Sequence, residues 1–149
     1  MVEISYNIKS LEWNKNLPSY KKCISNSVNQ TLKIIKFSSN NEVSISFLLT
    51  SNSEIKLFNQ RYRNNNKPTN VLSFPMNEQI ENKNYLGDVV IACEKIIDES
   101  SEQNIKKYKY LSKITIHGVL HLLGYKHDTD SQFNKMNSIE KNILEEMYK

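Results

Sequence analysis

The segment His117-Gly-Val-Leu-His-Leu-Leu-Gly-Tyr-Lys-His127 holds all three histidines of the 149-residue chain. His117 and His121 are four residues apart, so a helix places them one above the other on the same face. Gly124 then supplies a residue that can take the left-handed conformation with which many helices end. The chain can therefore turn back at this glycine and bring His127 towards the other two imidazoles.

Three converging imidazoles predict a zinc site, and a fourth position left for water is typical of catalytic rather than structural zinc. The spacing matches the extended zinc-protease motif H-E-x-x-H-x-x-G-x-x-H. Gly118 replaces the glutamate that acts as general base in those proteases. The alternative is that these are ordinary helix-end and core histidines. Three at this spacing, with none elsewhere in the chain, favour metal binding.

The composition predicts a single globular domain over residues 1–149, because 38% hydrophobic content suffices for a core. No stretch approaches the ~20 apolar residues of a membrane span, and the alternating N-terminus lacks a signal-peptide core. Cys23 and Cys93 form no C-x-x-C pair, which indicates a reduced, cytosolic protein. A net charge of +4 is compatible with a nucleic-acid partner, although many unrelated domains are mildly basic.

Apolar residues that alternate with polar ones, or that recur at helical spacing, define the expected elements. Strands are predicted at residues 2–8, 43–49, 71–75 and 86–92. Helices are predicted at residues 18–35, 93–103, 105–123 and 130–148, and a further short helix is expected to begin after an N-cap at Asn52 or Ser53. Strands interspersed with helices indicate an α+β fold, with a mixed, twisted sheet of about four strands packed with about five helices.

Two of the predicted strands carry more specific expectations. Pro75 should stop strand 71–75, which is expected at an edge of the sheet. The polar, asparagine-rich residues 76–84 are expected to form an exposed connection. Strand 86–92 has an almost wholly apolar second half, which predicts burial on both faces.

A second candidate functional residue is Arg63. Arg61 and Arg63 are the two arginines of the chain, and they lie on either side of Tyr62. A guanidinium offers a fixed fork of donors that matches phosphate oxygens and stays charged at any working pH. The alternative is a surface arginine at a helix end, where it would satisfy the last carbonyls.

Three segments together resemble the YbeY-type endoribonucleases, also called rRNA maturation factors. Phe58-Asn-Gln-Arg-Tyr-Arg63 followed by Lys67-Pro-Thr-Asn-Val-Leu-Ser-Phe-Pro75 resembles the family signature N-x-x-Y-R-x-x-x-x-P-T-[DN]-V-L-S-F-P. Leu86-Gly-Asp-Val-Val-Ile91 is similar to the family's L-G-D-I-x-I strand, and the histidine segment to H-G-x-L-H-L-x-G-Y-D-H. The three lie in the same order as in the family, and the chain length fits a whole-chain match.

The resemblance implies a zinc-dependent, single-strand-specific endoribonuclease that acts in ribosomal RNA maturation, at the 3′ end of the small-subunit rRNA, and in ribosome quality control. It implies His117, His121 and His127 as metal ligands, and catalytic roles for Arg63, His117 and His121. It also implies that the protein is located in the bacterial cytoplasm, binds the ribosome or its small subunit, and has no membrane partner. Lys126 departs from the family's aspartate before the third histidine and reverses the local charge.

Two other functions compete with this one. A metalloprotease shares the histidine spacing, but Gly118 leaves it without its usual base. A non-catalytic ribosome-assembly factor would hold a structural zinc, with Cys23 or Cys93 as the fourth ligand.

Three further assignments remain open at the level of sequence. The lysines at 106–113 either contact the phosphates of an RNA backbone without sequence preference or form a solvated helix face. Tyr125 either stacks on a base or packs on the core. Asp88 is a candidate to orient a metal-binding histidine, since such histidines usually donate their second nitrogen to a carboxylate or carbonyl.

Overall fold

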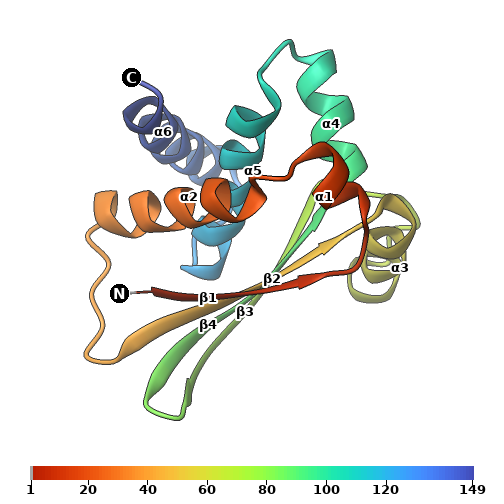
Figure 1. Ribbon diagram of the computed structural model, residues 1–149. Coiled ribbons are helices and arrows are strands. Elements are labelled where there is room, and N and C mark those ends of the chain that lie inside the picture. The colour runs from red at the N-terminus through yellow and green to blue at the C-terminus, as the bar shows by residue number, and fades with distance from the viewer. Residues whose placement is uncertain (1) are drawn as a thin grey trace.

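A four-stranded sheet forms the centre of the fold, described for residues 2–149 in a computed structural model (Figure 1). Along the chain the elements are β1 (Val2–Ile8), α1 (Glu12–Asn16), α2 (Tyr20–Ile34), β2 (Glu42–Thr50), α3 (Asn52–Arg63), β3 (Val71–Ile80), β4 (Lys83–Ala92), α4 (Cys93–Glu102), α5 (Lys107–Leu122) and α6 (Asp130–Met147). The expected α+β fold with a mixed sheet is confirmed. None of these helices combines the length and the apolar character needed to cross a membrane.

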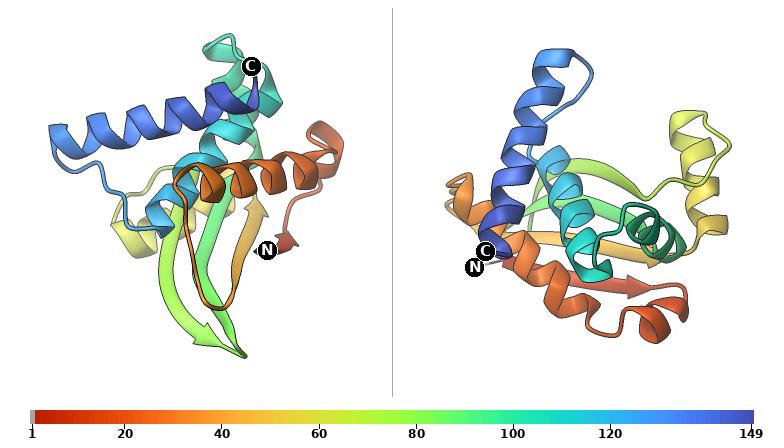
Figure 2. Two further views of the ribbon diagram at one scale, coloured as in Figure 1. Left: turned by 90° about the vertical axis from the view of Figure 1, so that its left-hand side faces the viewer. Right: turned by 90° about the horizontal axis from the view of Figure 1, so that it is seen from above.

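The strands lie in the order β1-β2-β4-β3. β1, β2 and β4 run parallel, and β3 is an antiparallel edge strand, as its proline predicted. Helices α2 and α5 cover one face of the sheet, and α3 packs on part of the other (Figures 1 and 2). The predicted burial of β4 on both faces is confirmed, because residues 89–92 are all buried between these layers.

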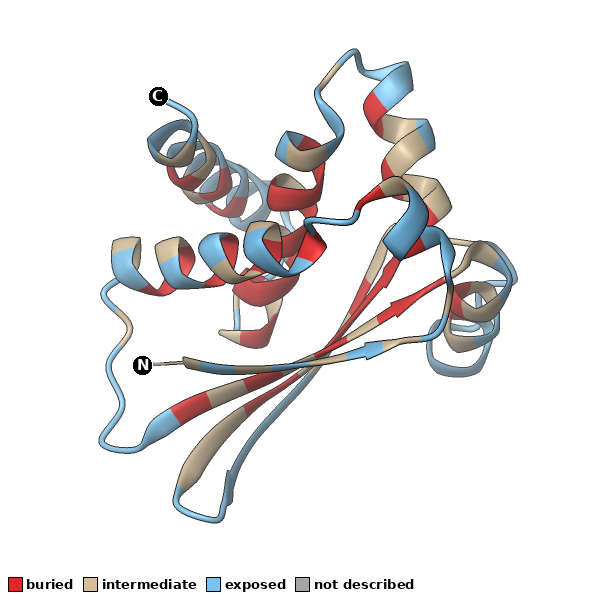
Figure 3. Ribbon diagram, viewed as in Figure 1, coloured by how far each residue is buried: buried red, intermediate tan, exposed pale blue. Residues whose placement is uncertain are grey.

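Helix α5 is the most deeply buried helix of the fold. Ten of its residues are buried, and Figure 3 shows the buried segments meeting between this helix and the sheet. The helix also packs against α6 through a second apolar cluster of Ile116, Leu120, Met136 and Ile143. Side chains at the C-terminal end of α5 are therefore held by packing on two sides.

The predicted exposure of 76–84 is confirmed for residues 76–82, but the prediction that this segment only connects two strands was wrong. β3 continues past Pro75 to Ile80 and forms a hairpin with β4. Proline is tolerated there because β3 is an edge strand and the pairing with β4 breaks register between Pro75 and Glu78. Glu81 and Asn82 both have positive φ (49° and 65°), which suits the tight turn of a two-residue hairpin.

Several element ends also differ from the prediction. Helix α1 was not expected, since five residues are too few to show a helical period, and it makes six helices in residues 2–149. It buries Trp13, whose Nε1 donates to the carbonyl oxygen of Thr50 at 3.0 Å. The cap of α3 is Ser51, which accepts from the backbone N–H of Glu54, rather than Asn52 or Ser53.

Candidate metal centre

The three histidines converge at the junction of α5 and α6, as the spacing predicted. His117 and His121 lie in the last turns of α5, and His127 lies in the connection to α6. One ring nitrogen from each histidine lies within 4.8 Å of the others. The ring of His127 lies 5.5 Å from that of His117 and 4.6 Å from that of His121, measured between centroids.

A glycine turn at the end of α5 produces this convergence. Gly124 adopts φ +96°, and its N–H donates to the carbonyl of His121 at 3.1 Å. The next residue, Tyr125, donates its N–H to the carbonyl of Leu120 at 3.1 Å. These two bonds satisfy the last carbonyls of the helix and reverse the chain, which returns His127 to the helix end.

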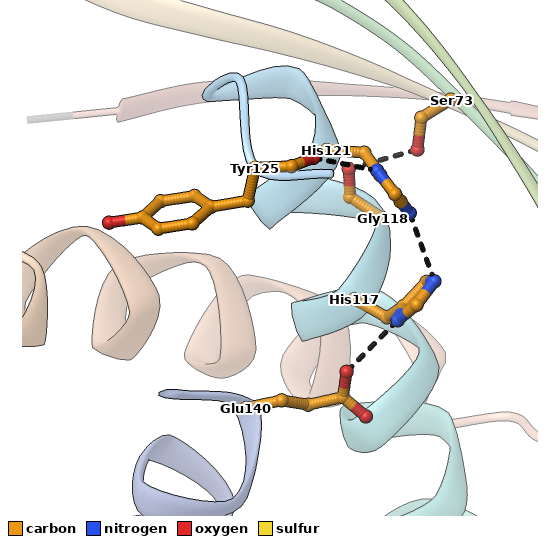
Figure 4. Close-up of polar contacts among 6 residues, drawn as sticks. All are labelled: Ser73, His117, Gly118, His121, Tyr125 and Glu140. Atoms are coloured by element: carbon orange, nitrogen blue, oxygen red, sulfur yellow. Dashed lines mark hydrogen bonds and ion pairs between the residues drawn. The ribbon is translucent and has the colours of Figure 1, made fainter. Parts of the chain in front are cut away.

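Hydrogen bonds orient two of the three imidazoles (Figure 4). His117 Nδ1 donates to Glu140 Oε2 at 2.9 Å, and His121 Nδ1 donates to the carbonyl oxygen of Tyr125 at 2.9 Å. Because both partners are acceptors, the proton of each neutral ring is assigned to Nδ1 and the lone pair to Nε2. Both Nε2 atoms therefore face the centre with lone pairs free to bind a metal.

The separation of these two nitrogens fits a shared metal ion. The Nε2 atoms of His117 and His121 are 3.1 Å apart. Two lone pairs at this distance repel each other, and a cation between them removes the repulsion. Nitrogens bound at about 2.0 Å to one tetrahedral zinc ion lie about 3.3 Å apart. The residues present therefore fit a zinc-type ion held by neutral imidazoles.

The protonation state of His121 favours metal binding. Burial, with smaller contributions from the neighbouring imidazoles of His117 and His127, lowers the pKa of His121 to about 4. His121 is consequently neutral at physiological pH, and neutral imidazole is the form that binds metal ions.

The three imidazoles form an open set. Among residues 2–149, no cysteine or carboxylate joins the group of metal-competent side chains around the histidines. Cys23 lies within hydrogen-bonding distance of Ser112, and Cys93 is buried at the start of α4. The alternative in which one of these cysteines supplies a fourth ligand is therefore wrong.

The structure also explains why glycine occupies position 118. A Cβ atom there would lie 2.9 Å from Val89 Cγ1 and 3.3 Å from Ser73 Oγ. The Ser73 hydroxyl donates to the carbonyl of Gly118 at 2.9 Å, which fixes α5 closely against β3 (Figure 4). A glutamate has no space at this position. The protease base is missing because that side of the helix lies against the sheet.

Arg63 lies in the same cleft as the histidines. This cleft, called the histidine cleft below, has a volume of about 840 Å³. Its lining includes Tyr62, Arg63, residues 69–75, Lys126 and the three histidines. Arg63 is exposed and is the last residue of α3, whereas His117 and His121 belong to α5, so the lining of the cleft comes from both helices.

Contacts around Arg63 hold this end of α3 in place. Helix α3 ends at Asn64, which adopts a left-handed conformation with φ 52°. The side-chain amide of Asn59 donates to the carbonyl of Lys67 at 2.9 Å and ties the following loop to the helix. The Tyr62 ring packs edge-on against Phe74, with centroids 5.2 Å apart. Asn59 and Tyr62 therefore hold in place the end of the helix that carries Arg63.

The structure decides two sequence-based suggestions near the centre: the one for Asp88 is wrong, and Tyr125 follows the second of its two alternatives. Asp88 lines a separate cavity on the other face of the sheet and accepts a hydrogen bond from the Tyr85 hydroxyl, so it does not orient a histidine. Glu140 does so instead. Sequence reasoning missed it, although a carboxylate between the apolar positions Met136 and Ile143 of α6 was a signal. The ring of Tyr125 points away from the histidines and packs on the apolar cluster between α5 and α6 (Figure 4).

The fold and the site define a single-domain α+β protein with an open three-histidine centre beside an arginine-lined cleft. Residues 6–148 match the model of the family described as Endoribonuclease YbeY, and the chain belongs to this family.

Individual relatives agree with this assignment. The chain is 35% identical over 153 residues to the Endoribonuclease YbeY of Bartonella bacilliformis, which covers 99% of this chain and 94% of the relative. It is 38% identical over 130 residues to that of Syntrophomonas wolfei, covering 81% and 82%. A solution structure of a Thermotoga maritima protein has a TM-score of 0.52 and 25% identity, covering 99% of this chain and 92% of that one.

Proposed function

We propose that the protein is a zinc-dependent endoribonuclease that cleaves single-stranded RNA in the histidine cleft. The observation that carries the proposal is the pair of inward-facing Nε2 atoms, 3.1 Å apart, in a cleft that also contains Arg63. Membership of the Endoribonuclease YbeY family supports RNA as the substrate.

In this proposal His117, His121 and His127 hold the metal through their ring nitrogens. Glu140 and the carbonyl of Tyr125 keep two of the rings in the required tautomer and orientation. When bound, zinc supplies a Lewis acid and a water whose pKa falls to about 7, which removes the need for the carboxylate base that Gly118 replaces.

Arg63 binds the phosphate group that is cleaved. Its guanidinium is planar, permanently charged and able to donate two parallel hydrogen bonds to phosphate oxygens. Stabilising the charge that develops on the phosphate in the transition state is commonly worth ~10²–10³ in rate. Lys126, which also lines the cleft, adds a second positive charge beside His127.

The proposed biological role is maturation of ribosomal RNA, at the 3′ end of the small-subunit rRNA, together with ribosome quality control. The protein would act in the bacterial cytoplasm and bind the ribosome or its small subunit. The family resemblance supports this role, and the net charge of +4 is compatible with an RNA-rich partner. Accumulation of uncut small-subunit rRNA precursors in cells that lack the protein would test it.

The direct test is cleavage of a labelled single-stranded RNA by the purified protein, beside His121→Ala purified in the same way. The variant detects contaminating ribonuclease, which is the main artefact. We expect cleavage by the wild type, no cleavage by the variant or after chelation, and one zinc per chain by elemental analysis.

Equal cleavage by both proteins, or by neither, would contradict the proposal. In that case a non-catalytic assembly factor with a structural metal becomes the better explanation. Zinc-dependent hydrolysis of casein would instead revive a metalloprotease, against which the packing of Gly118 argues.

A further inference from the structure

A groove between α5 and α6 leads away from the metal centre. Side chains spaced four residues apart form its two walls, as expected for one face of each helix. The walls consist of Lys109, Lys113 and His117 on α5, and of Phe133, Asn137 and Lys141 on α6. From Lys109 to His117 the groove follows α5 for about 12 Å. We call it the lysine groove.

The lysine groove is continuous with the metal centre. It consists of two hollows of about 280 and 340 Å³, which share Lys113, Asn137 and Glu140. The first hollow is also lined by His117 and His127. These two histidines also line the histidine cleft, so the imidazoles separate the two cavities. A strand that is cleaved at the metal can therefore extend into both.

The groove carries unpaired positive charge. Among residues 2–149, no carboxylate oxygen lies within 4.0 Å of the ammonium groups of Lys109, Lys113 or Lys141. Two acidic side chains line the groove. Glu140 is buried and hydrogen-bonded to His117, which leaves Glu145 as the exposed one. Lys109 and Lys113 lie over the rings of Tyr148 and Tyr110, which leaves their positive charge uncompensated. Three ammonium groups without a carboxylate partner exceed the charge of Glu145 and complement a polyanion.

The rest of the predicted lysine cluster lies elsewhere. Lys107 donates to the backbone carbonyl of Asn16 at 2.8 Å, and Lys106 is the residue before the first turn of α5. The structure thus divides the cluster into lysines that face the groove and lysines that do not.

An exposed aromatic ring lies at the end of the groove nearest the metal. Phe133, in the first turn of α6, is 55% exposed. An apolar ring left in water beside a row of cations is the combination used by proteins that bind single-stranded nucleic acid, where bases stack on aromatic faces and phosphates contact lysines.

We propose that the lysine groove is a binding subsite for single-stranded RNA that continues beyond the cleaved phosphate. Lys109, Lys113 and Lys141 contact successive phosphates, and one base stacks on Phe133. The stacked base must be unpaired, which excludes a duplex from this part of the site. This inference rests on the proposed function and adds a path for the substrate on the second side of the metal.

The test compares two triple variants of the metal-loaded protein that lose the same charge. The groove variant is Lys109→Gln, Lys113→Gln and Lys141→Gln, and the control is Lys15→Gln, Lys22→Gln and Lys33→Gln, on exposed positions of α1 and α2. Affinity for a fluorescent single-stranded RNA is measured by anisotropy over a series of salt concentrations. Circular dichroism establishes that both variants are folded.

We expect the groove variant to bind RNA at least about tenfold more weakly, and the control to stay within about twofold of the wild type. The slope of log affinity against log salt should fall by about 2 in the groove variant, at ~0.7 per phosphate contact. Phe133→Leu, which keeps an apolar side chain but no stacking face, should weaken binding by about tenfold with an unchanged salt slope.

Equal losses of RNA affinity in the two triple variants would overturn the proposal. It would also be overturned if the wild type bound duplex RNA as tightly as single-stranded RNA, or bound neither. The proposed function is judged separately, by the effect of His121→Ala on cleavage. If RNA binding depends on the groove lysines but the wild type does not cleave RNA, the proposed nuclease activity is refuted and the RNA-binding subsite stands. If the wild type cleaves RNA but binding does not depend on the groove lysines, only the subsite is refuted.

Discussion

The two walls of the histidine cleft are built in different ways. The histidine wall consists of a deeply buried helix, a glycine turn and two imidazoles whose Nδ1 atoms are already hydrogen-bonded. The arginine wall is the exposed end of α3, where no carboxylate among residues 2–149 lies within 4.0 Å of Arg63. One wall is ready for a metal ion before substrate arrives, whereas the other keeps its charge free for a ligand. Changes to the two walls should therefore have separable effects.

Among the four predictions that follow, the largest effect is expected from Arg63→Ala. RNA cleavage should fall by ~10²–10³, because the charge that develops on the phosphate loses its donor. Zinc content and the melting temperature should stay at wild-type values. Arg61→Ala, which removes the other arginine of the chain, is the matched control and should cleave normally. Loss of zinc from Arg63→Ala would show that the two walls are not independent.

Glu140→Gln should act on the histidine wall alone. The amide can still accept from His117 Nδ1, but it no longer carries the negative charge that makes the imidazole a better ligand. Zinc affinity should fall by roughly 10–100-fold, as is typical when such a partner is altered. Competition with a fluorescent chelator measures the change. Glu146→Gln, an exposed charge on the same helix, is the control, and an equal loss there would exclude a specific role for Glu140.

Gly118→Ala tests the packing beneath the histidines. A methyl group would approach Val89 at 2.9 Å and force α5 away from the sheet. Overpacking costs ~1–3 kcal/mol, and alanine recovers up to about 1 kcal/mol of helix preference, so we expect a net loss on the order of 1 kcal/mol. Chemical denaturation of the metal-free protein measures it. Unchanged or increased stability would mean that the helix and sheet can separate without cost.

A separate prediction concerns the pH dependence of stability. The pKa of His121 is about 4 in the folded protein and about 6.5 in an unfolded chain. Between these values the unfolded state binds more protons, so the metal-free protein should lose stability as pH falls from about 6.5 towards 4. Urea midpoints of the metal-free wild type and His121→Ala, measured across this range, give the difference. A variant with the same pH dependence as the wild type would refute the assignment.

Local patterns were sufficient to predict most of the fold and the histidine centre. Helical spacing and Gly124 fix where His117, His121 and His127 lie relative to one another, since all three belong to one helix end. Period-two alternation likewise placed the start of each strand to within a few residues. Such features depend on neighbours in the chain, which is why sequence alone reveals them.

Features that depend on distant partners could not be predicted in this way. Asp88 lies on the opposite face of the sheet from the histidines, although strict alternation from Leu86 would place it on the helix-covered face. In the structure β4 breaks its register with β2 next to Gly87, which turns Asp88 to the opposite face. Glu140 contacts a histidine 23 positions earlier, a pairing that only the docking of α6 on α5 creates.

The contact between Glu140 and His117 would also link the proposed metal to the lifetime of the protein. Because α6 provides a partner for a proposed metal ligand, binding of a metal ion and docking of this helix would stabilise each other by the same amount of free energy. A chain without metal would release α6 more often and expose the apolar surface beneath it to proteases. The abundance of the protein would then follow the zinc content of the cell, with no dedicated sensor required.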